Sequence, residues 1–168
     1  SQAEAAFNAT VFVQATTAVG LLGGGRLADL LYHRTKASRL WLMCASLLLC
    51  APCLHALGNS DSLLGTRLAA AGFGLFSGLL MGNIFPAAFD VVPPETRASA
   101  VGFLNFFGAI MSGFATLFGG ELKQTLGIGR LLSLSALAYT AAALALMLGI
   151  QKLFWKDFAQ NHVPPPAP

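Results

Sequence analysis

Five long apolar runs, each close to or above the length of a membrane span, constrain this chain more than any other feature of its sequence. They cover residues 7–24, 40–57, 63–92, 98–122 and 131–150. A helix needs roughly 20 mostly apolar residues to cross about 30 Å of hydrocarbon. Only 10% of the residues are charged, against about 25% in an ordinary soluble domain. The pattern predicts an all-α membrane protein with five transmembrane helices.

Short turn segments separate the runs. Residues 58–62 form a turn cluster, Gly-Asn-Ser-Asp-Ser, and residues 127–129, Gly-Ile-Gly, break the last pair of runs. Residues 93–95, Pro-Pro-Glu, are typical of a helix start, with proline early and an acid in the first turn. Short links make neighbouring helices antiparallel, so residues 1–152 are predicted to form a transmembrane helical bundle. Residues 153–168 are predicted to form a polar, proline-rich tail.

The cationic residues are distributed unequally between the two ends of this predicted bundle. One end holds Arg26, Arg34, Lys36, Arg39, Arg97, Lys152 and Lys156. The other end holds Lys123 and Arg130, and Arg67 falls within a span. Because Lys and Arg near a span resist translocation, the richer end is expected to face the cytoplasm. We therefore predict a multi-pass protein of the plasma membrane, or of the cell inner membrane in a bacterium, with a cytoplasmic C-terminus.

The same topology accounts for the net charge of +3 without a nucleic-acid partner. The lipid bilayer is the expected environment of the chain. With five spans, the N-terminus lies on the opposite side from the tail. The chain begins Ser-Gln-Ala-Glu, with no initiator methionine and no basic region ahead of the first apolar run, so no signal peptide is predicted. An odd number of spans with an external N-terminus favours the C-terminal fragment of a longer protein.

Two segments carry a resemblance to a known family. Residues 23–35, with Gly23-Gly24-Gly25, Leu27-Ala28-Asp29 and His33-Arg34-Thr35, resemble the GxLaDrxGrr motif of major facilitator superfamily transporters, in its copy between helices 8 and 9. Residues 93–102 (PPETRASAVG), followed by NFFG at 105–108, are similar to the helix 10 to 11 junction of organic anion symporters and sugar-acid carriers. The first match departs from the motif at Leu30 and Tyr32, where a basic residue and a glycine are usual.

The resemblance covers nearly the whole chain as helices 8 to 12, which implies part of the C-terminal six-helix bundle of a major facilitator fold. It implies a secondary active transporter of a small organic solute, an organic anion or sugar acid coupled to H+ or Na+. The missing N-terminal half is then an essential partner, and this chain alone is not competent for transport. An efflux antiporter for amphipathic compounds is the alternative, because the phenylalanine-rich helices suit an apolar pocket.

Catalysis is not expected. The sequence shows no phosphate loop, nucleophile elbow or paired carboxylates, which argues against an ATPase or hydrolase, and no cofactor is predicted. By resemblance, the gating or conformational residues are Gly25, Asp29 and Arg34 in the first motif and Arg97 in the second. The Asp29 carboxylate is expected to meet a helix end of the other half, where the helix dipole favours an anion. An ordinary solvated loop charge at Asp29 is the competing interpretation.

Arg67 is the first candidate for substrate binding. It lies about one turn inside the third run, on a stripe of small residues at three- and four-residue spacing: Ala71, Gly74, Gly78 and Gly82. Such steps favour close helix packing, so this side is expected to face protein. A guanidinium matches a carboxylate or phosphate bidentately, which makes Arg67 a candidate anion-binding residue. The alternative is that its guanidinium extends to the lipid headgroups.

Three amides complete the predicted binding set. Gln14 lies in the middle of the first run, and Asn105 lies on the small, polar face of the fourth. Asn83 precedes Pro86, which is expected to kink the third helix. An amide within a span requires a partner or a water-filled cavity, so each amide is a candidate substrate contact or a bond between helices.

Cys50 and Cys53 form a CxxC pair that favours a different class, a membrane thiol-disulfide oxidoreductase. Cys44 and His55 lie nearby. Reactive thiolates require an electropositive, accessible environment, whereas leucine and alanine surround this pair, so small packing residues are the favoured interpretation. His33 lies between the first two apolar runs and His162 lies in the tail, and no metal site is predicted.

The topology can be tested by cysteine labelling in a variant that lacks the native thiols. Cysteines placed at Lys36 and after Trp155 are expected to react from the same side of the membrane, and a cysteine at Ser60 from the opposite side. Labelling of positions 36 and 60 from one side would contradict the alternating five-span topology.

Overall fold

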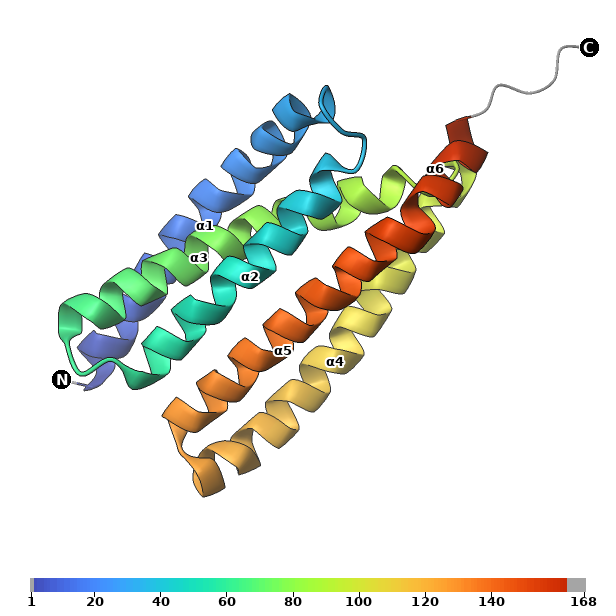
Figure 1. Ribbon diagram of the computed structural model, residues 1–168. Helices are drawn as coiled ribbons and strands as arrows, with labels where there is room; N and C mark the ends of the chain where they lie inside the picture. The colour runs from blue at the N-terminus through green and yellow to red at the C-terminus, as the bar shows by residue number, and fades with distance from the viewer. Residues whose placement is uncertain (1, 163–168) are drawn as a thin grey trace, which may run out of the picture.

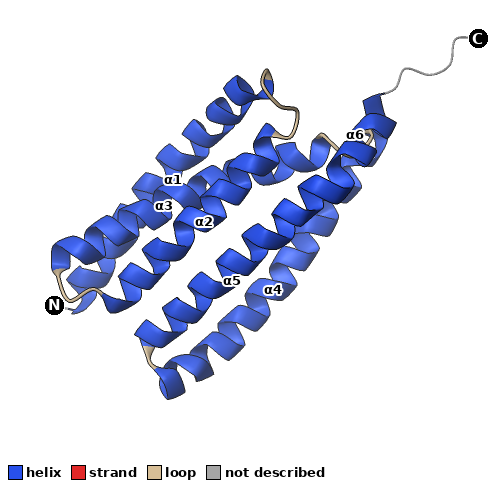
Figure 2. Ribbon diagram, viewed as in Figure 1, coloured by secondary structure: helices blue, strands red, loops and turns tan. Residues whose placement is uncertain are grey.

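The computed structural model describes residues 2–162, and that part of the chain is helical without a strand (Figures 1 and 2). Five long helices follow one another, and a short one ends the chain. They are α1 (Gln2–Tyr32), α2 (Ser38–Asn59), α3 (Leu63–Phe89), the 3₁₀ turn η1 (Pro94–Thr96), α4 (Arg97–Leu126), α5 (Ile128–Gly149), the π-helical segment η2 (Ile150–Phe154) and α6 (Trp155–His162). Consecutive long helices run antiparallel, as Figure 1 shows.

Within the described residues, four helical stretches are long and apolar enough to cross a membrane: Ser38–Asn59, Leu63–Phe89, Pro94–Leu126 and Ile128–Ala159. The prediction of an all-helical, multi-pass membrane protein is confirmed by these four. Helix α1 is 31 residues long and is not among these four stretches of the described residues. The fifth span, residues 7–24, therefore stays a prediction, as does the major facilitator fold.

Helix α1 runs further than the first apolar run. It continues through the three glycines at 23–25 and ends at Tyr32, so only residues 33–37 connect it to α2. A glycine inside a helix costs about 1 kcal/mol relative to alanine. At Gly24 that cost is offset by packing, because a Cβ there would lie 2.9 Å from the Leu79 Cα of α3. Residues 25–32, which lie between the first two apolar runs, thus form the last two turns of α1.

The turn residues match their predicted roles. Ser62 begins α3, and its hydroxyl accepts a hydrogen bond of 3.0 Å from the Gly65 amide. Gly127 joins α4 to α5 with a φ of 78°, a left-handed conformation that favours glycine. Pro94 lies at the start of η1, which leads directly into α4.

The C-terminal end is helical beyond the predicted boundary at residue 152. α5, η2 and α6 follow one another without a break up to His162. Phe154 is buried, and with Ile150 it packs against Ala37 and Cys44 near the start of α2. The first residues of the predicted tail therefore belong to the packed bundle, and residues 163–168 lie outside the described part of the chain.

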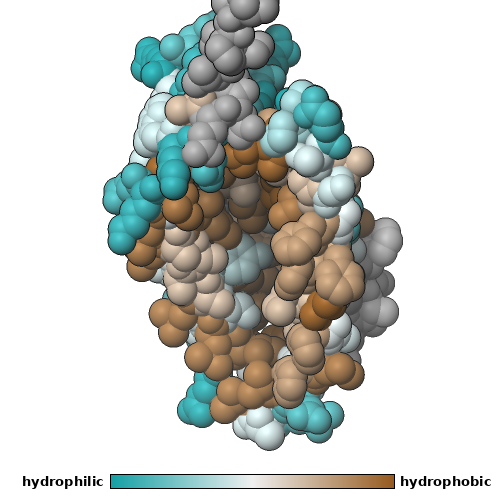
Figure 3. Space-filling view, turned by 90° about the vertical axis from the view of Figure 1, so that its right-hand side faces the viewer, coloured by the Kyte–Doolittle hydropathy of each residue, from teal (hydrophilic) through white to brown (hydrophobic). Residues whose placement is uncertain are grey.

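The helices are packed to different extents. α3 lies against both α1 and α2, α2 lies against α5, and α4 has few contacts, mainly with α5 and α3 (Figure 1). None of the residues of α4 is buried, whether on its phenylalanine side or on its small polar side. Figure 3 shows hydrophobic residues in a broad band, hydrophilic residues gathered at the two ends, and a hollow in the middle of this face. This distribution is the one that a bilayer requires.

The closest packing in the bundle joins α1 to α3 through glycines. Gly74 and Gly78 of α3 are buried, and a Cβ at either would collide with main-chain atoms of α1. A Cβ on Gly82 would lie 2.7 Å from the Leu21 carbonyl oxygen of α1. The prediction that this glycine stripe faces protein is confirmed.

Gly78→Ala is expected to lower the free energy of unfolding by about 1–3 kcal/mol, because the added methyl must push α1 away from α3. The Cβ would collide with the Thr17 carbonyl oxygen and lie 2.8 Å from the Leu21 amide nitrogen. Thermal unfolding in detergent micelles measures the effect. Gly102→Ala in α4 is the matched control, since no atom lies within 4 Å of its Cβ position. Equal stability of the two variants would contradict the close approach of α1 and α3.

Candidate functional site

A charged cluster joins three helices at the end of the bundle that carries most of the cations. The Arg39 guanidinium, in the first turn of α2, donates two hydrogen bonds to carboxylates. Nη1 lies 2.7 Å from Oδ1 of Asp90, the residue that caps the C-terminus of α3. Nη2 lies 2.9 Å from Oδ1 of Asp29, near the end of α1. Arg39 therefore fixes the ends of α1 and α3 to the start of α2.

The two ion pairs differ in exposure to solvent. The side chain of Asp90 is 12% exposed and that of Arg39 is 23% exposed, whereas Asp29 is 66% exposed. Solvent and salt weaken exposed pairs, which contribute about 0.2–1 kcal/mol. Hydrogen bonds to charged groups that are shielded contribute more, about 1.5–3 kcal/mol. The Arg39–Asp90 pair therefore contributes most of the stability of the cluster. The Asp29 carboxylate stays largely exposed and available to another partner.

Neighbouring contacts hold Arg39 in place. The buried Ser38 hydroxyl donates a hydrogen bond of 3.0 Å to the Ala28 carbonyl oxygen, which seats the start of α2 against α1. The Tyr32 ring lies between two cations, with Lys36 Nζ 4.1 Å and Arg39 Cζ 5.6 Å from its centroid. Cation–π contacts of this kind add about 0.5–1 kcal/mol at exposed sites.

Arg97 acts at the same end of α3. Its Nη2 donates a hydrogen bond of 3.4 Å to the Phe89 carbonyl oxygen, and its Cζ lies 5.3 Å from the centroid of the Phe89 ring. A cation at this position stabilises the last carbonyls of α3 and the negative end of the helix dipole. The first turn of α4 is thereby tied to the helix end that carries Asp90.

The predicted gating residues are thus only partly brought together. Asp29 belongs to the cluster and Arg97 lies beside it. Arg34 is exposed on the α1–α2 connection and lines a pocket of about 300 Å³ with Ser38 and Trp41. Gly25 lies inside α1, with no atom within 4 Å of its Cβ position, so it has no packing role here.

Sequence reasoning did not select Arg39 and Asp90 as site residues. They are 51 positions apart, and their pairing depends on how α2 and α3 cross. The available signal was topological: Arg39 opens the second run and Asp90 falls at the end of the third, so both lie at one end of an alternating bundle.

The four predicted binding residues lie in separate places. Arg67 is exposed, and its Cζ is 5.8 Å from the centroid of the Phe12 ring. Gln14 is exposed and lines a pocket of about 230 Å³ with Thr10, Val13, Leu57 and Ala70. Asn105 is exposed on α4.

Asn83 is fully buried in α3. Its Nδ2 donates a hydrogen bond of 2.8 Å to the Leu79 carbonyl oxygen, and the same atom lies 3.2 Å from the Cβ position of Gly24. Its Oδ1 has no hydrogen-bond partner among the described residues. A buried acceptor without a partner costs about 1–3 kcal/mol. The amide therefore lies in the α1–α3 contact and is shielded from an open cavity in this conformation.

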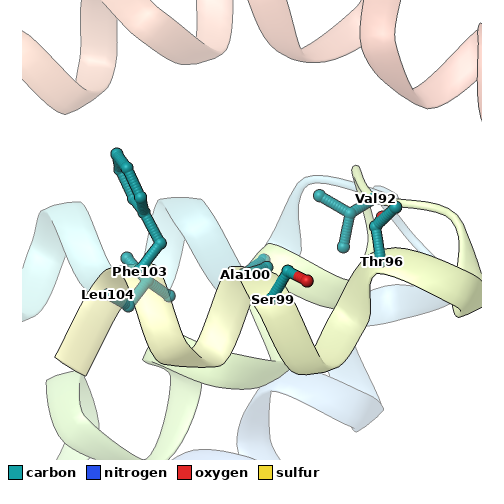
Figure 4. Close-up of a pocket in the computed structure, with 7 residues that line it drawn as sticks. Val92, Thr96, Ser99, Ala100, Phe103 and Leu104 are labelled. Atoms are coloured by element: carbon teal, nitrogen blue, oxygen red, sulfur yellow. The ribbon is translucent and has the colours of Figure 1, made fainter. Parts of the chain in front are cut away.

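A pocket of about 400 Å³ lies where α3 passes into α4 (Figure 4). Its lining residues come from the end of α3, the connection and the first turns of α4: Ala88, Val92, Thr96, Ser99, Ala100, Phe103 and Leu104. Figure 4 shows Phe103 projecting from α4 at one side of the pocket and Val92 and Thr96 at the other, with Ala100 and Ser99 between them. Most of this pocket falls within the 93–102 segment singled out in the sequence. This pocket was not foreseen from the sequence, because its lining combines the end of α3, the connection and the first turns of α4.

The cysteines pack against neighbouring helices. All three are free thiols. Cys44 Sγ lies 3.4 Å from the Ala143 carbonyl oxygen of α5, and Cys50 Sγ lies 4.0 Å from the Phe73 carbonyl oxygen of α3. Cys53 Sγ fills the space that a Cβ on Gly72 would occupy. These contacts favour the packing interpretation. No group of metal-ligating side chains is found in the part of the chain that the structure describes.

Comparison with protein-family models, with curated proteins and with solved structures finds no match to this chain. The charged cluster and the pockets are therefore interpreted from their own chemistry.

Asp90→Asn is expected to lower the free energy of unfolding by about 1–3 kcal/mol, because it leaves the shielded Arg39 guanidinium without its closest carboxylate. Asp29→Asn removes an exposed pair and is expected to cost under about 1 kcal/mol. Thermal unfolding of the two variants provides the comparison. Asp61→Asn, an exposed acid at the opposite end, is the control for net charge. A larger loss in the free energy of unfolding for Asp29→Asn than for Asp90→Asn would contradict the conclusion that the Asp90 pair is the stronger of the two.

Proposed function

We propose that this chain is the C-terminal part, helices 8 to 12, of a secondary active transporter of the major facilitator type. Its substrate is a small organic solute, an organic anion or sugar acid, moved with H+ or Na+. The chain works with an N-terminal half in the plasma membrane, with its C-terminus in the cytoplasm. The observation that carries this proposal is the cluster of Asp29, Arg39 and Asp90 at the cation-rich end of a helical membrane bundle.

The cluster suits a cytoplasmic gate for a physical reason. Alternating access requires one bundle to rock against the other as a unit. The shielded Arg39–Asp90 pair makes the ends of α2 and α3 move together, and the Asp29 bond adds α1. The exposed part of the Asp29 carboxylate is free to meet a helix N-terminus of the other half, where the dipole favours an anion. This contact closes the cytoplasmic side and breaks when the gate opens.

The solute-binding side of the proposal rests on Arg67. Its guanidinium is exposed and lies 5.8 Å from the centroid of the Phe12 ring, so it is available to the carboxylate of a substrate held between the two bundles. Gln14, Asn83 and Asn105 are secondary candidates. Efflux of amphipathic compounds is the alternative function, favoured by the nearly apolar lining of the α3–α4 pocket, in which Thr96 and Ser99 supply the hydroxyls.

Substrate binding and transport rate, measured side by side in the full-length transporter, test the proposal. Asp29→Asn is expected to slow transport while leaving substrate affinity unchanged, because it weakens the gate and not the cavity. Arg67→Lys keeps the charge but loses the planar fork, and is expected to weaken binding by something on the order of 1 to 3 kcal/mol.

Asp61→Asn and Lys123→Arg, at matched expression, are the controls for exposed charge. An unchanged transport rate in Asp29→Asn would return this residue to an ordinary solvated charge. Equal affinity in Arg67→Lys would remove Arg67 from the binding site.

A further inference from the structure

Two adjoining pockets flank α5 at the end of the bundle opposite the charged cluster. One, of about 450 Å³, lies between α2 and α5 and is lined by Ala51, Pro52, His55, Ser133, Ala136, Leu137 and Thr140. The other, of about 270 Å³, is lined by Leu126, Arg130, Ser133, Leu134 and Leu137. Ser133 and Leu137 belong to both, so the two form one continuous surface, here called the α5 groove.

Polar groups are concentrated at one end of the α5 groove. His55 Nδ1 lies 3.0 Å from Ser133 Oγ, and Asn59 Nδ2 donates to the same oxygen at 3.1 Å. Ser133 in turn donates a hydrogen bond of 3.0 Å to the Gly129 carbonyl oxygen. The direction of the hydrogen bond between His55 Nδ1 and Ser133 Oγ depends on the tautomer of the imidazole.

Arg130 supplies positive charge at this end. It is exposed, lies in the first turn of α5 and forms no ion pair within residues 10–159. A guanidinium of this kind binds phosphate through two parallel hydrogen bonds.

The rest of the α5 groove is apolar, and its length along the helix matches the thickness of one lipid leaflet. Leu134 and Leu137 are 47% and 67% exposed, and Ala136 and Thr140 continue the wall toward the middle of the bundle. The ten steps of the helix from Arg130 to Thr140 span about 15 Å at a rise of 1.5 Å per residue. Half of a hydrocarbon core of about 30 Å is the same length.

We propose that the α5 groove binds an anionic phospholipid. The phosphate pairs with Arg130 beside the His55–Asn59–Ser133 cluster, and one acyl chain lies along Leu134, Leu137 and Thr140. A soluble anion would use the cation but leave the apolar wall uncovered. A packed partner helix would cover the wall but leave the guanidinium without an anion. A phospholipid satisfies both parts of the surface at once.

The test uses the full chain in mild detergent, with native mass spectrometry counting bound lipid. Phosphatidylglycerol and phosphatidylcholine are the probes. Retention of phosphatidylglycerol above phosphatidylcholine is expected for the unaltered chain. Arg130→Gln is expected to weaken phosphatidylglycerol binding on the order of fivefold, because one cation near the headgroups contributes about 1 kcal/mol. Lys123→Gln, which removes a cation at the same end but outside the α5 groove, is expected to leave binding unchanged.

Thr140→Phe tests the acyl-chain part independently, since it fills the groove without touching Arg130, and it is also expected to weaken binding. Circular dichroism and thermal unfolding verify that each variant is folded, and Arg130→Ala replaces Arg130→Gln if the latter is not. Equal loss in Lys123→Gln would show nonspecific charge attraction and overturn the site. Displacement of bound lipid by inorganic phosphate would show a soluble-anion site instead. Unchanged binding in both Arg130→Gln and Thr140→Phe would also overturn the proposal.

Discussion

The approach of α1 and α3 at their glycines is the contact on which the rest of the structure depends. Inside a bilayer the hydrophobic effect does not hold helices together, so close van der Waals packing must do so. Gly24, Gly74 and Gly78 allow the two backbones to touch, and a side chain at any of them would separate the helices. That contact fixes the axial position of α1 against α3. Asp29 and Asp90 consequently end at the same level, one on each side of Arg39.

Arg39 adds an electrostatic contact to this helix packing. Its guanidinium pairs with two acids, and the two acids differ in their exposure to solvent. Asp90 is shielded and holds α3, whereas Asp29 remains open to solvent. The proposed gate and the proposed lipid site lie at opposite ends of the bundle. The gate offers the Asp29 carboxylate to its partner, and the lipid site offers the Arg130 guanidinium. A transporter half arranged in this way would meet protein at one end and lipid at the other.

Local signals in the sequence were sufficient for the elements but not for their ends or their pairings. The apolar runs predicted the four helices that are long and apolar enough to cross a membrane, and the turns at residues 58–62 and at Gly127 were foreseen, because each depends on chemistry within a few residues. The protein-facing side of the α3 glycine stripe was foreseen from its three- and four-residue spacing. The sequence did not predict that α1 extends to Tyr32, because the cost of Gly24 inside the helix is offset by packing against α3, which is distant in the sequence. Asn83 was predicted to be a substrate contact or a bond between helices, and its burial in the α1–α3 contact depends on which helix packs there, which periodicity does not specify. The Arg39–Asp90 bond is a property of the crossing of two helices, which no local pattern encodes.

The π-helical segment η2 has a consequence for the last helix. A π turn accommodates one extra residue, which rotates everything downstream by about 100° relative to an uninterrupted α-helix. Phe154 is thereby turned inward while Trp155, the next residue, stays 52% exposed. Phe154 and Ile150 press on Ala37 and Cys44, on either side of Arg39 in the sequence. A twist applied to α6 would therefore reach the corner that holds the three helix ends through the contact of Phe154 and Ile150 with the start of α2.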